Sequence, residues 1–173
     1  MTTSLSLITR QEAPATIDPQ KLRKAFGHFP SGIAAIAADV QGSPEVMVAS
    51  SFSVGVSLDP PLVLFSAQKS STTWPVIASA DRIGVSVLSQ EHSAACRQLA
   101  SRNRDIRFSS VSTRTTQAGA VEIEGSTAWF DCSVFAVHEA GDHYIVVFRV
   151  HDLHLNEDKQ PLVFHRSQFT HPA

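Results

Sequence analysis

The sequence has few of the residues that would crosslink a small protein or charge its surface. Its 173 residues include two cysteines, Cys96 and Cys132, and no Cys-x-x-Cys pair, so neither a disulfide framework nor a thiolate zinc site is indicated. Charged residues make up 17%, against roughly 25% in an average soluble domain. No stretch approaches the ~18 apolar residues of a membrane helix, and the start does not read as a signal peptide. We therefore expect a cytoplasmic protein with reduced thiols that does not bind membranes.

The charge balance excludes another class of partner. The chain has 14 Lys and Arg against 16 Asp and Glu, giving a net charge of −2. Nucleic-acid-binding domains usually carry a strong basic excess, so we expect no nucleic-acid partner. A surface with so few charges is commonly used in a dimer interface, and a homodimer is therefore expected.

The length fits one domain, since domains average roughly 100–200 residues. Residues 1–17 are rich in Ser, Thr, Gln and Pro without periodicity and are predicted to be a flexible tail. Residues 18–173 are predicted to form the single domain. Asp18 and Pro19 suit a helix N-cap and first turn, which predicts an amphipathic helix from Pro19 to about His28. Its apolar side chains at helical spacing are Leu22, Ala25, Phe26 and Phe29.

The remaining chain indicates a mainly β, antiparallel barrel with two or three peripheral helices. Two further helices are predicted, from Thr73 to about Ala80 and from Ser89 to about Arg102. Turn residues 41–44 and 139–142 are typical of hairpin loops. Because Tyr144–Phe148 is apolar at every position, it is predicted to be covered on both faces, by the core and by a helix or a second subunit. The predicted strands are Gly32–Val40, Val46–Ser53, Leu62–Ala67, Arg82–Leu88, Thr127–His138 and His143–Leu155.

Several kinds of chemistry have no support in the sequence. The eight histidines are dispersed, and His151 and His154 lie three apart in a predicted strand, which places them on opposite faces. No metal site is therefore expected. A Gly-x-Ser-x-Gly elbow, a Walker loop and a Gly-x-Gly-x-x-Gly loop are all absent from the sequence, so hydrolysis by a nucleophile and Rossmann-type binding lack positive evidence.

Two hydroxyl-rich segments remain as candidates for binding. Residues 69–73 read Lys-Ser-Ser-Thr-Thr and lead into a predicted helix, a combination that suits a phosphate. Residues 49–53 read Ala-Ser-Ser-Phe-Ser and would add hydrogen-bond donors. The alternative interpretation is helix capping and a polar loop.

Two more features admit both a structural and a functional interpretation. Gly141-Asp142-His143 is ordinary hairpin chemistry, although His143 could also contact a ligand. Arg102, Arg104 and Arg107 follow a predicted helix, where arginines favour the helix dipole. They could instead hold the phosphate of an anionic cofactor, or meet a 2′-phosphate on a nicotinamide nucleotide.

The order of these pieces resembles the flavin-reductase-like family, small NAD(P)H:flavin oxidoreductases with an FMN-binding split-barrel fold. The resemblance runs from Leu22 to Phe169. The stretch Ser-Leu-Asp-Pro-Pro at residues 57–61 and the later Gly-Asp-His at residues 141–143 carry it most specifically. Further matching stretches are residues 29–33, 49–52, 70–75, 84–88, 107–108 and 161–164.

The resemblance implies a homodimer with each flavin near the subunit interface, and it implies roles for particular residues. Around the isoalloxazine it places Ala49, Ser50, Ser51, Phe52 and Ser57. Along the ribityl chain and phosphate it places Ser66, Lys69, Ser70, Ser71 and Thr72. Arg107 and Phe108 would flank the pocket, Phe164 would lie at a C-terminal site position, and Gly141, Asp142 and His143 would bind the nicotinamide nucleotide, with His143 orienting it.

The implied function is NAD(P)H-dependent reduction of FMN, or alternatively FAD, by hydride transfer, with reduced flavin passed to a partner monooxygenase. Such a reaction needs positioning more than acid–base groups, in keeping with the absence of a catalytic triad motif. A non-catalytic split barrel that binds flavin or haem is the alternative. An enzyme resembling pyridoxamine-phosphate oxidase is a third interpretation that the order of the motifs favours less.

Overall fold

The computed structural model describes residues 17–170. The tail predicted for residues 1–17 lies outside the described residues apart from Ile17. The assignment of residues 18–173 to one domain stays a prediction.

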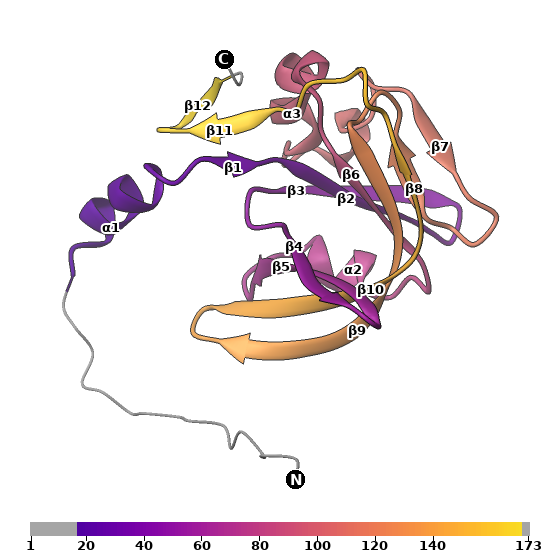
Figure 1. The fold of residues 1–173 in the computed structure, drawn as a ribbon, viewed down its shortest axis with the longest axis horizontal. Coiled ribbons are helices and arrows are strands. Elements are labelled where there is room, and N and C mark those ends of the chain that lie inside the picture. The colour runs from indigo at the N-terminus through magenta and orange to yellow at the C-terminus, as the bar shows by residue number, and fades with distance from the viewer. Residues whose placement is uncertain (1–16, 171–173) are drawn as a thin grey trace, which may run out of the picture.

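An antiparallel seven-stranded sheet forms the greater part of the described chain and curls around a core (Figure 1). Its strand order is β3-β2-β6-β9-β10-β5-β4, so segments far apart in the sequence become neighbours. The prediction of a mainly β, antiparallel fold is confirmed. The strands are β2 (Ala34–Val40), β3 (Ser43–Ala49), β4 (Ser53–Leu58), β5 (Pro61–Gln68), β6 (Ile83–Val87), β9 (Ala128–Ala140) and β10 (His143–Leu155).

Short elements surround this sheet. Three α-helices are described, matching the predicted two or three, together with two 3-10 turns and two small sheets. The small sheets join strands of two or three residues, which are too short to show periodicity in the sequence. The helices are α1 (Pro19–Phe26), α2 (Trp74–Ile77), α3 (Ser93–Leu99), η1 (Gln90–His92) and η2 (Arg104–Ile106), and the short strands are β1 (Ser31–Gly32), β7 (Thr113–Thr115), β8 (Val121–Ile123), β11 (Val163–His165) and β12 (Gln168–Thr170).

Both predicted hairpins are present. Gln41 and Gly42 connect β2 to β3 with φ angles of 55° and 82°, the left-handed backbone that a tight two-residue hairpin turn requires. Ala140 pairs with His143 across the β9–β10 hairpin, and Gly141 between them has a φ of 60°. This second turn places His143 at the first position of β10.

The helices begin where the sequence predicts but end sooner. Asp18 caps α1, its Oδ1 accepting a hydrogen bond from Gln20 N at 2.9 Å. The α2 helix stops at Ile77 rather than Ala80, because the next residues turn back with i→i+3 hydrogen bonds. The predicted helix from Ser89 to Arg102 divides into η1 and α3. The His92 imidazole accounts for the division, since its Nδ1 accepts the Ser89 N–H at 3.1 Å.

The core lies on both faces of the sheet. Along β2, Ile36 belongs to one buried cluster, while its neighbours Ala35 and Ala37 belong to the other. The first cluster contains Phe65 stacked on Phe148, with ring centroids 5.4 Å apart. The second packs beneath α3.

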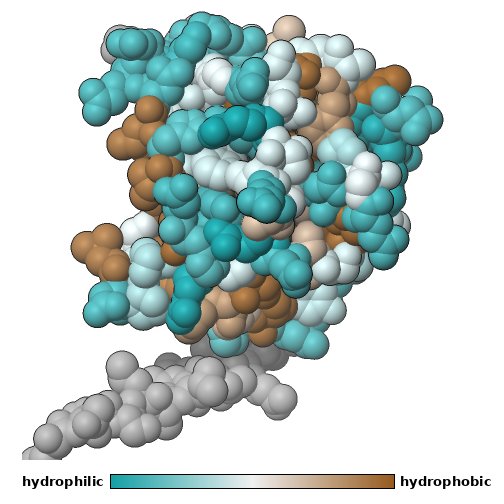
Figure 2. Space-filling view, turned by 90° about the vertical axis from the view of Figure 1, so that its right-hand side faces the viewer, coloured by the Kyte–Doolittle hydropathy of each residue, from teal (hydrophilic) through white to brown (hydrophobic). Residues whose placement is uncertain are grey.

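Apolar side chains on α1 and β10 are not fully covered within the described chain. No residue of α1 is buried, and the exposed side chains of Phe26 and Phe29 extend the apolar side of this helix. In β10, Val146 and Phe148 are buried, whereas Ile145 and Val147 on the other face are half-buried. Within the described chain one face of Tyr144–Phe148 is covered by the core and the other is partly covered, and its predicted cover by a second subunit stays a prediction. By contrast, Figure 2 shows the side of the molecule that carries β7 and β8 as mostly hydrophilic.

Candidate functional site

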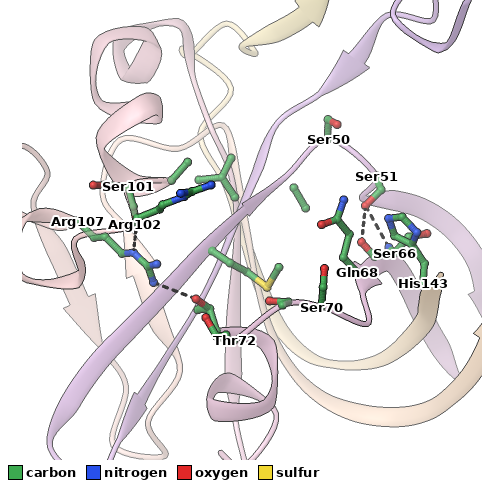
Figure 3. A pocket seen from close by; sticks show the side chains of 16 residues that line it. Ser50, Ser51, Ser66, Gln68, Ser70, Thr72, Ser101, Arg102, Arg107 and His143 are labelled. Carbon is green, nitrogen blue, oxygen red and sulfur yellow. Dashed lines mark hydrogen bonds between the residues drawn. The ribbon is translucent and has the colours of Figure 1, made fainter. Parts of the chain in front are cut away.

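A pocket of about 570 Å³ lies where β3, β5, α3 and β10 come together (Figure 3). We call it the polar pocket, because hydroxyl and other polar side chains dominate its lining. Ser101, Arg102 and Arg107 lie on one side, Ser51, Ser66 and His143 lie on the other, and Ser70 and Thr72 lie between them. Nine residues predicted from the sequence line it, namely Ala49, Ser50, Ser51, Ser66, Ser70, Ser71, Thr72, Arg107 and His143.

The charge of the pocket lining has one sign. Among its lining residues the titratable side chains are Arg102, Arg107 and His143, and no carboxylate lines it. Hydroxyl donors combined with cationic groups, in the absence of acidic ones, favour an anionic ligand.

The connection between β3 and β4 supplies the middle of the pocket. The sequence predicted one strand over Val46–Ser53, but β3 ends at Ala49 and β4 begins at Ser53. Ser51 explains this break, because its Oγ accepts from Ser66 N at 3.1 Å and donates to Ser66 O at 3.0 Å. A side chain therefore takes the place of backbone pairing beside β5. No hydrogen bond from the backbone N–H groups of residues 50–52 is found among the described residues.

A second cavity of about 330 Å³ continues from this point, and we call it the aromatic hollow. It shares Ser50 and Ser51 with the polar pocket, and the rings of Phe29 and Phe52 line it. The two cavities together offer a polar, cationic end and an end where two aromatic rings stand among serines and small residues. Phe52, predicted at the isoalloxazine, lies in the aromatic hollow.

The loop over residues 69–73 differs from its predicted form. The helix that follows it, α2, has four residues, and the N–H of Trp74 is already accepted by Ser71 Oγ at 3.1 Å. The predicted contribution of a helix N-terminus to anion binding is therefore not available. The hydroxyls of Ser70 and Thr72 stay in the pocket lining.

Lys69, predicted to bind the phosphate, is not in the pocket lining. Its ammonium group pairs with Glu139 Oε2 at 3.0 Å and lies 5.4 Å from the centre of the Tyr144 ring. The hairpin between β9 and β10 passes beside Lys69 and supplies both partners. The structure thus uses this lysine to hold the hairpin rather than to line the pocket.

Arg107 braces the pocket, that is, its hydrogen bonds tie together the segments that form it. Its side chain is buried, and its Nε donates to Ser101 O at 2.7 Å while Nη1 donates to Val46 O at 2.9 Å. Nη1 also lies 3.6 Å from Glu45 Oε2. Burial lowers the pKa of the Arg107 guanidinium, and the Glu45 carboxylate acts in the opposite direction. Although Arg107 lines the pocket, its hydrogen bonds go to the protein.

Arg104 completes this brace. Its Nη1 pairs with Glu45 Oε1 at 3.1 Å, and its Nη2 donates to Thr72 O at 3.1 Å. Glu45 thus joins two arginines that between them hold β3, the 69–73 loop and the segment after α3.

His143 faces the polar pocket from the start of β10, opposite Gln68 in the strand register. Its Nδ1 lies 2.8 Å from Asp142 Oδ1. Because a carboxylate only accepts, this contact fixes the proton on Nδ1 and leaves Nε2 directed elsewhere. The hydrogen bond from His143 lowers the pKa of Asp142.

Five other predicted residues lie outside both cavities. Phe108 and Phe164 pack against the second core cluster, which explains their apolar character without a ligand. Asp142 acts through His143, as described above. The full set is Ser57, Phe108, Gly141, Asp142 and Phe164.

The pocket also contains residues that the sequence did not single out as site residues. Thr73 and Arg102 belong to segments considered above. Gln68, at the end of β5, pairs with His143 of β10, a long-range contact that no local sequence pattern records. The others project from strand and loop positions that have no composition signal, and they are Met47, Val48, Ala100 and Ser101.

Metal and thiol chemistry find no support in the described residues. Among residues 17–170, no three His, Cys, Asp or Glu side chains are grouped as metal ligands. Within the same range, no helix has the length and apolar character to cross a membrane. Burial raises the pKa of Cys96 to about 11 and that of Cys132 to about 12, so both stay protonated thiols near neutral pH.

A model of the flavin reductase like domain matches residues 26–173. The chain belongs to the flavin-reductase-like family. The resemblance that the ordered motifs indicated is therefore confirmed, and so is the fold that it implied.

Individual members of the family are similar over most of their length. A flavin reductase of Pseudomonas putida is 40% identical over 156 residues, covering 90% of this chain and 91% of that protein. A protein of Rhodococcus jostii named flavin-dependent monooxygenase, reductase subunit HsaB, is 35% identical over 158 residues, covering 91% and 80%. The solved structure of the NADH:FAD oxidoreductase SgcE6 of Streptomyces globisporus, in complex with NAD and FAD fragments, has a TM-score of 0.83 at 29% identity, covering 92% and 98%.

Proposed function

We propose that this chain is an NAD(P)H-dependent flavin reductase that transfers a hydride from the nicotinamide to FMN or FAD. The observation that carries the proposal is the polar pocket, which nine of the residues expected at the flavin and nicotinamide site line together, with no carboxylate among the lining residues. The pocket shares Ser50 and Ser51 with the aromatic hollow. Family membership and the names of the similar proteins support the same activity.

The shape of the two cavities fits a flavin. A flavin nucleotide has an aromatic ring system at one end and a phosphate at the other, joined by a hydroxylated chain. The rings of Phe29 and Phe52 suit the first, while the hydroxyls of Ser70 and Thr72 with the nearby cationic groups suit the second. The bound flavin and nicotinamide themselves supply the redox chemistry.

The protein contributes binding and orientation. Ser50 and Ser51 lie where the two cavities meet, and the N–H groups of residues 50–52 provide fixed donors for negative charge at the polar edge of the ring. His143, held by Asp142, presents Nε2 to the pocket and orients the nicotinamide nucleotide. Holding two rings together removes much of the entropic barrier to transfer.

A homodimer would cover the apolar surfaces that the chain leaves exposed. Val54, Val56 and Leu58 are exposed on the edge strand β4, and Phe135 and Val137 are exposed on β9. An apolar edge strand is a site of association unless something covers it. Light scattering after gel filtration should give twice the chain mass of 18.7 kDa; a monomer would contradict the dimer.

The reduced flavin is proposed to leave for a partner monooxygenase. One relative is named as the reductase subunit of such an enzyme. The wide opening of the polar pocket, lined by exposed residues such as Ser50 and Arg102, is consistent with a flavin that exchanges.

The activity is tested with purified protein, each of FMN and FAD, and each of NADH and NADPH, by following the absorbance of the reduced nicotinamide. Flavin-dependent oxidation is expected with at least one pair, and a mixture without flavin is the control. Flavin binding without oxidation of either nucleotide would contradict the reductase and favour a non-catalytic flavin-binding barrel.

A further inference from the structure

Four cationic side chains belong to the segments that form the polar pocket and are candidates to bind an anionic ligand. Three of them already bind other groups of the protein. Lys69 pairs with Glu139, and Arg104 pairs with Glu45 and Thr72 O. Arg107 gives its hydrogen bonds to Ser101 O, Val46 O and Thr73 Oγ1. The fourth is Arg102.

Arg102 differs from these three in having no protein partner. Among residues 17–170 its side chain forms neither an ion pair nor a hydrogen bond, yet it lines the polar pocket. Figure 3 shows it extending from the end of α3 over the pocket, on the side opposite Ser51 and His143 and at the same end as Thr72. A guanidinium has five N–H donors, and none of those of Arg102 is bound to the described residues.

The charge distribution of a flavin nucleotide indicates which part of it would lie near Arg102. In a flavin mononucleotide the ring system and the ribityl chain are uncharged, so the phosphate is the anionic part. With the ring in the aromatic hollow, the phosphate falls toward Ser70, Thr72 and Arg102 at the other end. A guanidinium binds phosphate through two parallel hydrogen bonds, an arrangement that an ammonium group does not reproduce.

We propose that Arg102 is the residue that binds the flavin phosphate, so that this reductase selects phosphorylated flavins over riboflavin. The inference rests on the proposed function and adds the identity of the cation and the basis of flavin selection. Arg104 and Arg107 hold the segments that form the cavity, and Arg102 supplies the positive charge that binds the phosphate.

The experiment compares Arg102→Ala, Arg102→Lys and the control Arg97→Ala. Arg97 is an exposed arginine on α3 that does not line the polar pocket, so its removal changes the net charge equally. The KM for FMN and for riboflavin and the KM for NADH and for NADPH are measured for each protein. Thermal unfolding verifies that the variants are folded.

Arg102→Ala should raise the KM for FMN about 10- to 100-fold, the loss typical of a charged hydrogen-bonded contact, and leave that for riboflavin within about twofold. Arg102→Lys should lie between this variant and the wild type, and Arg97→Ala should match the wild type. An equal rise for FMN and riboflavin, or none for FMN, would overturn the inference while the reductase activity stands.

Two other outcomes are also decisive. If Arg102→Ala raises the KM for NADPH and not for FMN, Arg102 binds the 2′-phosphate of the nucleotide and the inference is wrong. If the wild type reduces no flavin, the proposed function fails first, and the inference fails with it.

Discussion

The two ends of the polar pocket are built differently. At the end near Thr72, the buried side chain of Arg107 and the largely buried side chain of Glu45 bind strands and loops together through charged hydrogen bonds. At the end near the aromatic hollow, Ser50 is exposed and the His143 side chain is 34% exposed. One end is therefore formed before any ligand arrives, whereas the other depends on the ligand or a second subunit for cover.

This contrast fits the proposed function, in which the flavin is bound, reduced and then released. At the braced end, the hydrogen bonds of Arg107 hold the surrounding strand and loops in fixed positions, so the cavity exists before a ligand enters and less entropy is lost on binding. The open end has exposed side chains and can adapt to the two rings that the proposed reaction brings together. A substitution in the brace should therefore lower the free energy of unfolding, whereas a substitution at the open end should change the kinetics.

The largest effect is expected at the braced end, for Arg107→Ala. The substitution leaves the carbonyl oxygens of Val46 and Ser101 without their donor and removes a buried partner of Glu45. We expect a loss of about 2–4 kcal/mol in the free energy of unfolding. Urea denaturation followed by circular dichroism measures it. The control is Arg102→Ala, expected within about 0.5 kcal/mol of the wild type; equal losses for the two variants would remove the distinction between a braced and a free arginine.

At the open end, His143→Ala should change kinetics and not stability. Among residues 17–170 the His143 side chain makes one hydrogen bond, with the exposed carboxylate of Asp142. We expect about a 10-fold higher KM for the nicotinamide nucleotide and less than a twofold change for flavin, because one oriented hydrogen bond is lost. Steady-state kinetics with each substrate varied measures both values. His138→Ala, an exposed histidine on β9, is the control; equal effects on both substrates would contradict the assigned role.

Much of the fold follows from local patterns in the sequence. The Asp18–Pro19 start of α1 and the hairpin turns at Gln41–Gly42 and Gly141–Asp142 lie where residue type and turn chemistry predict them. These features depend on neighbours only a few residues away. The ends of α2 and α3 were predicted less well, because hydrogen bonds such as that of His92 decide them.

The sequence predicted which segments form the candidate site but not which partners their side chains bind. The hydroxyl-rich segments do meet in one pocket. That Lys69 pairs with Glu139, and Arg107 with Val46 and Glu45, follows from contacts between residues about 60–70 positions apart, which no local pattern records. The sequence placed Lys69 at the phosphate and Arg107 beside the pocket and left the roles of Arg102 and Arg104 open, whereas the fold shows which of these cations have protein partners.

A smaller effect is expected where the two ends meet, for Ser51→Ala. The change removes both hydrogen bonds that the Ser51 hydroxyl makes with the backbone of Ser66. We expect a loss of about 1 kcal/mol in stability and a rise of a few-fold in the KM for flavin. Ser50→Ala is the matched control, because the Ser50 side chain forms no hydrogen bond among residues 17–170 and should leave stability unchanged. A Ser51 variant as stable as the control would show that the break between β3 and β4 does not need this hydroxyl.

The smallest effect concerns the pH dependence of the Asp142–His143 contact. The hydrogen bond from His143 lowers the pKa of Asp142 below its usual 3.8. A carboxyl whose folded-state pKa is depressed stabilises the fold above its unfolded pKa, and this contribution is lost as the pH falls through the folded value. The difference in melting temperature between wild type and Asp142→Asn should therefore be constant above about pH 5 and shrink below about pH 4. Because Asp142 is exposed, the difference should be small, and high salt should reduce it further. Melting curves at matched ionic strength test this, and a difference that grows as the pH falls would mean that the neutral carboxyl, not the carboxylate, holds His143.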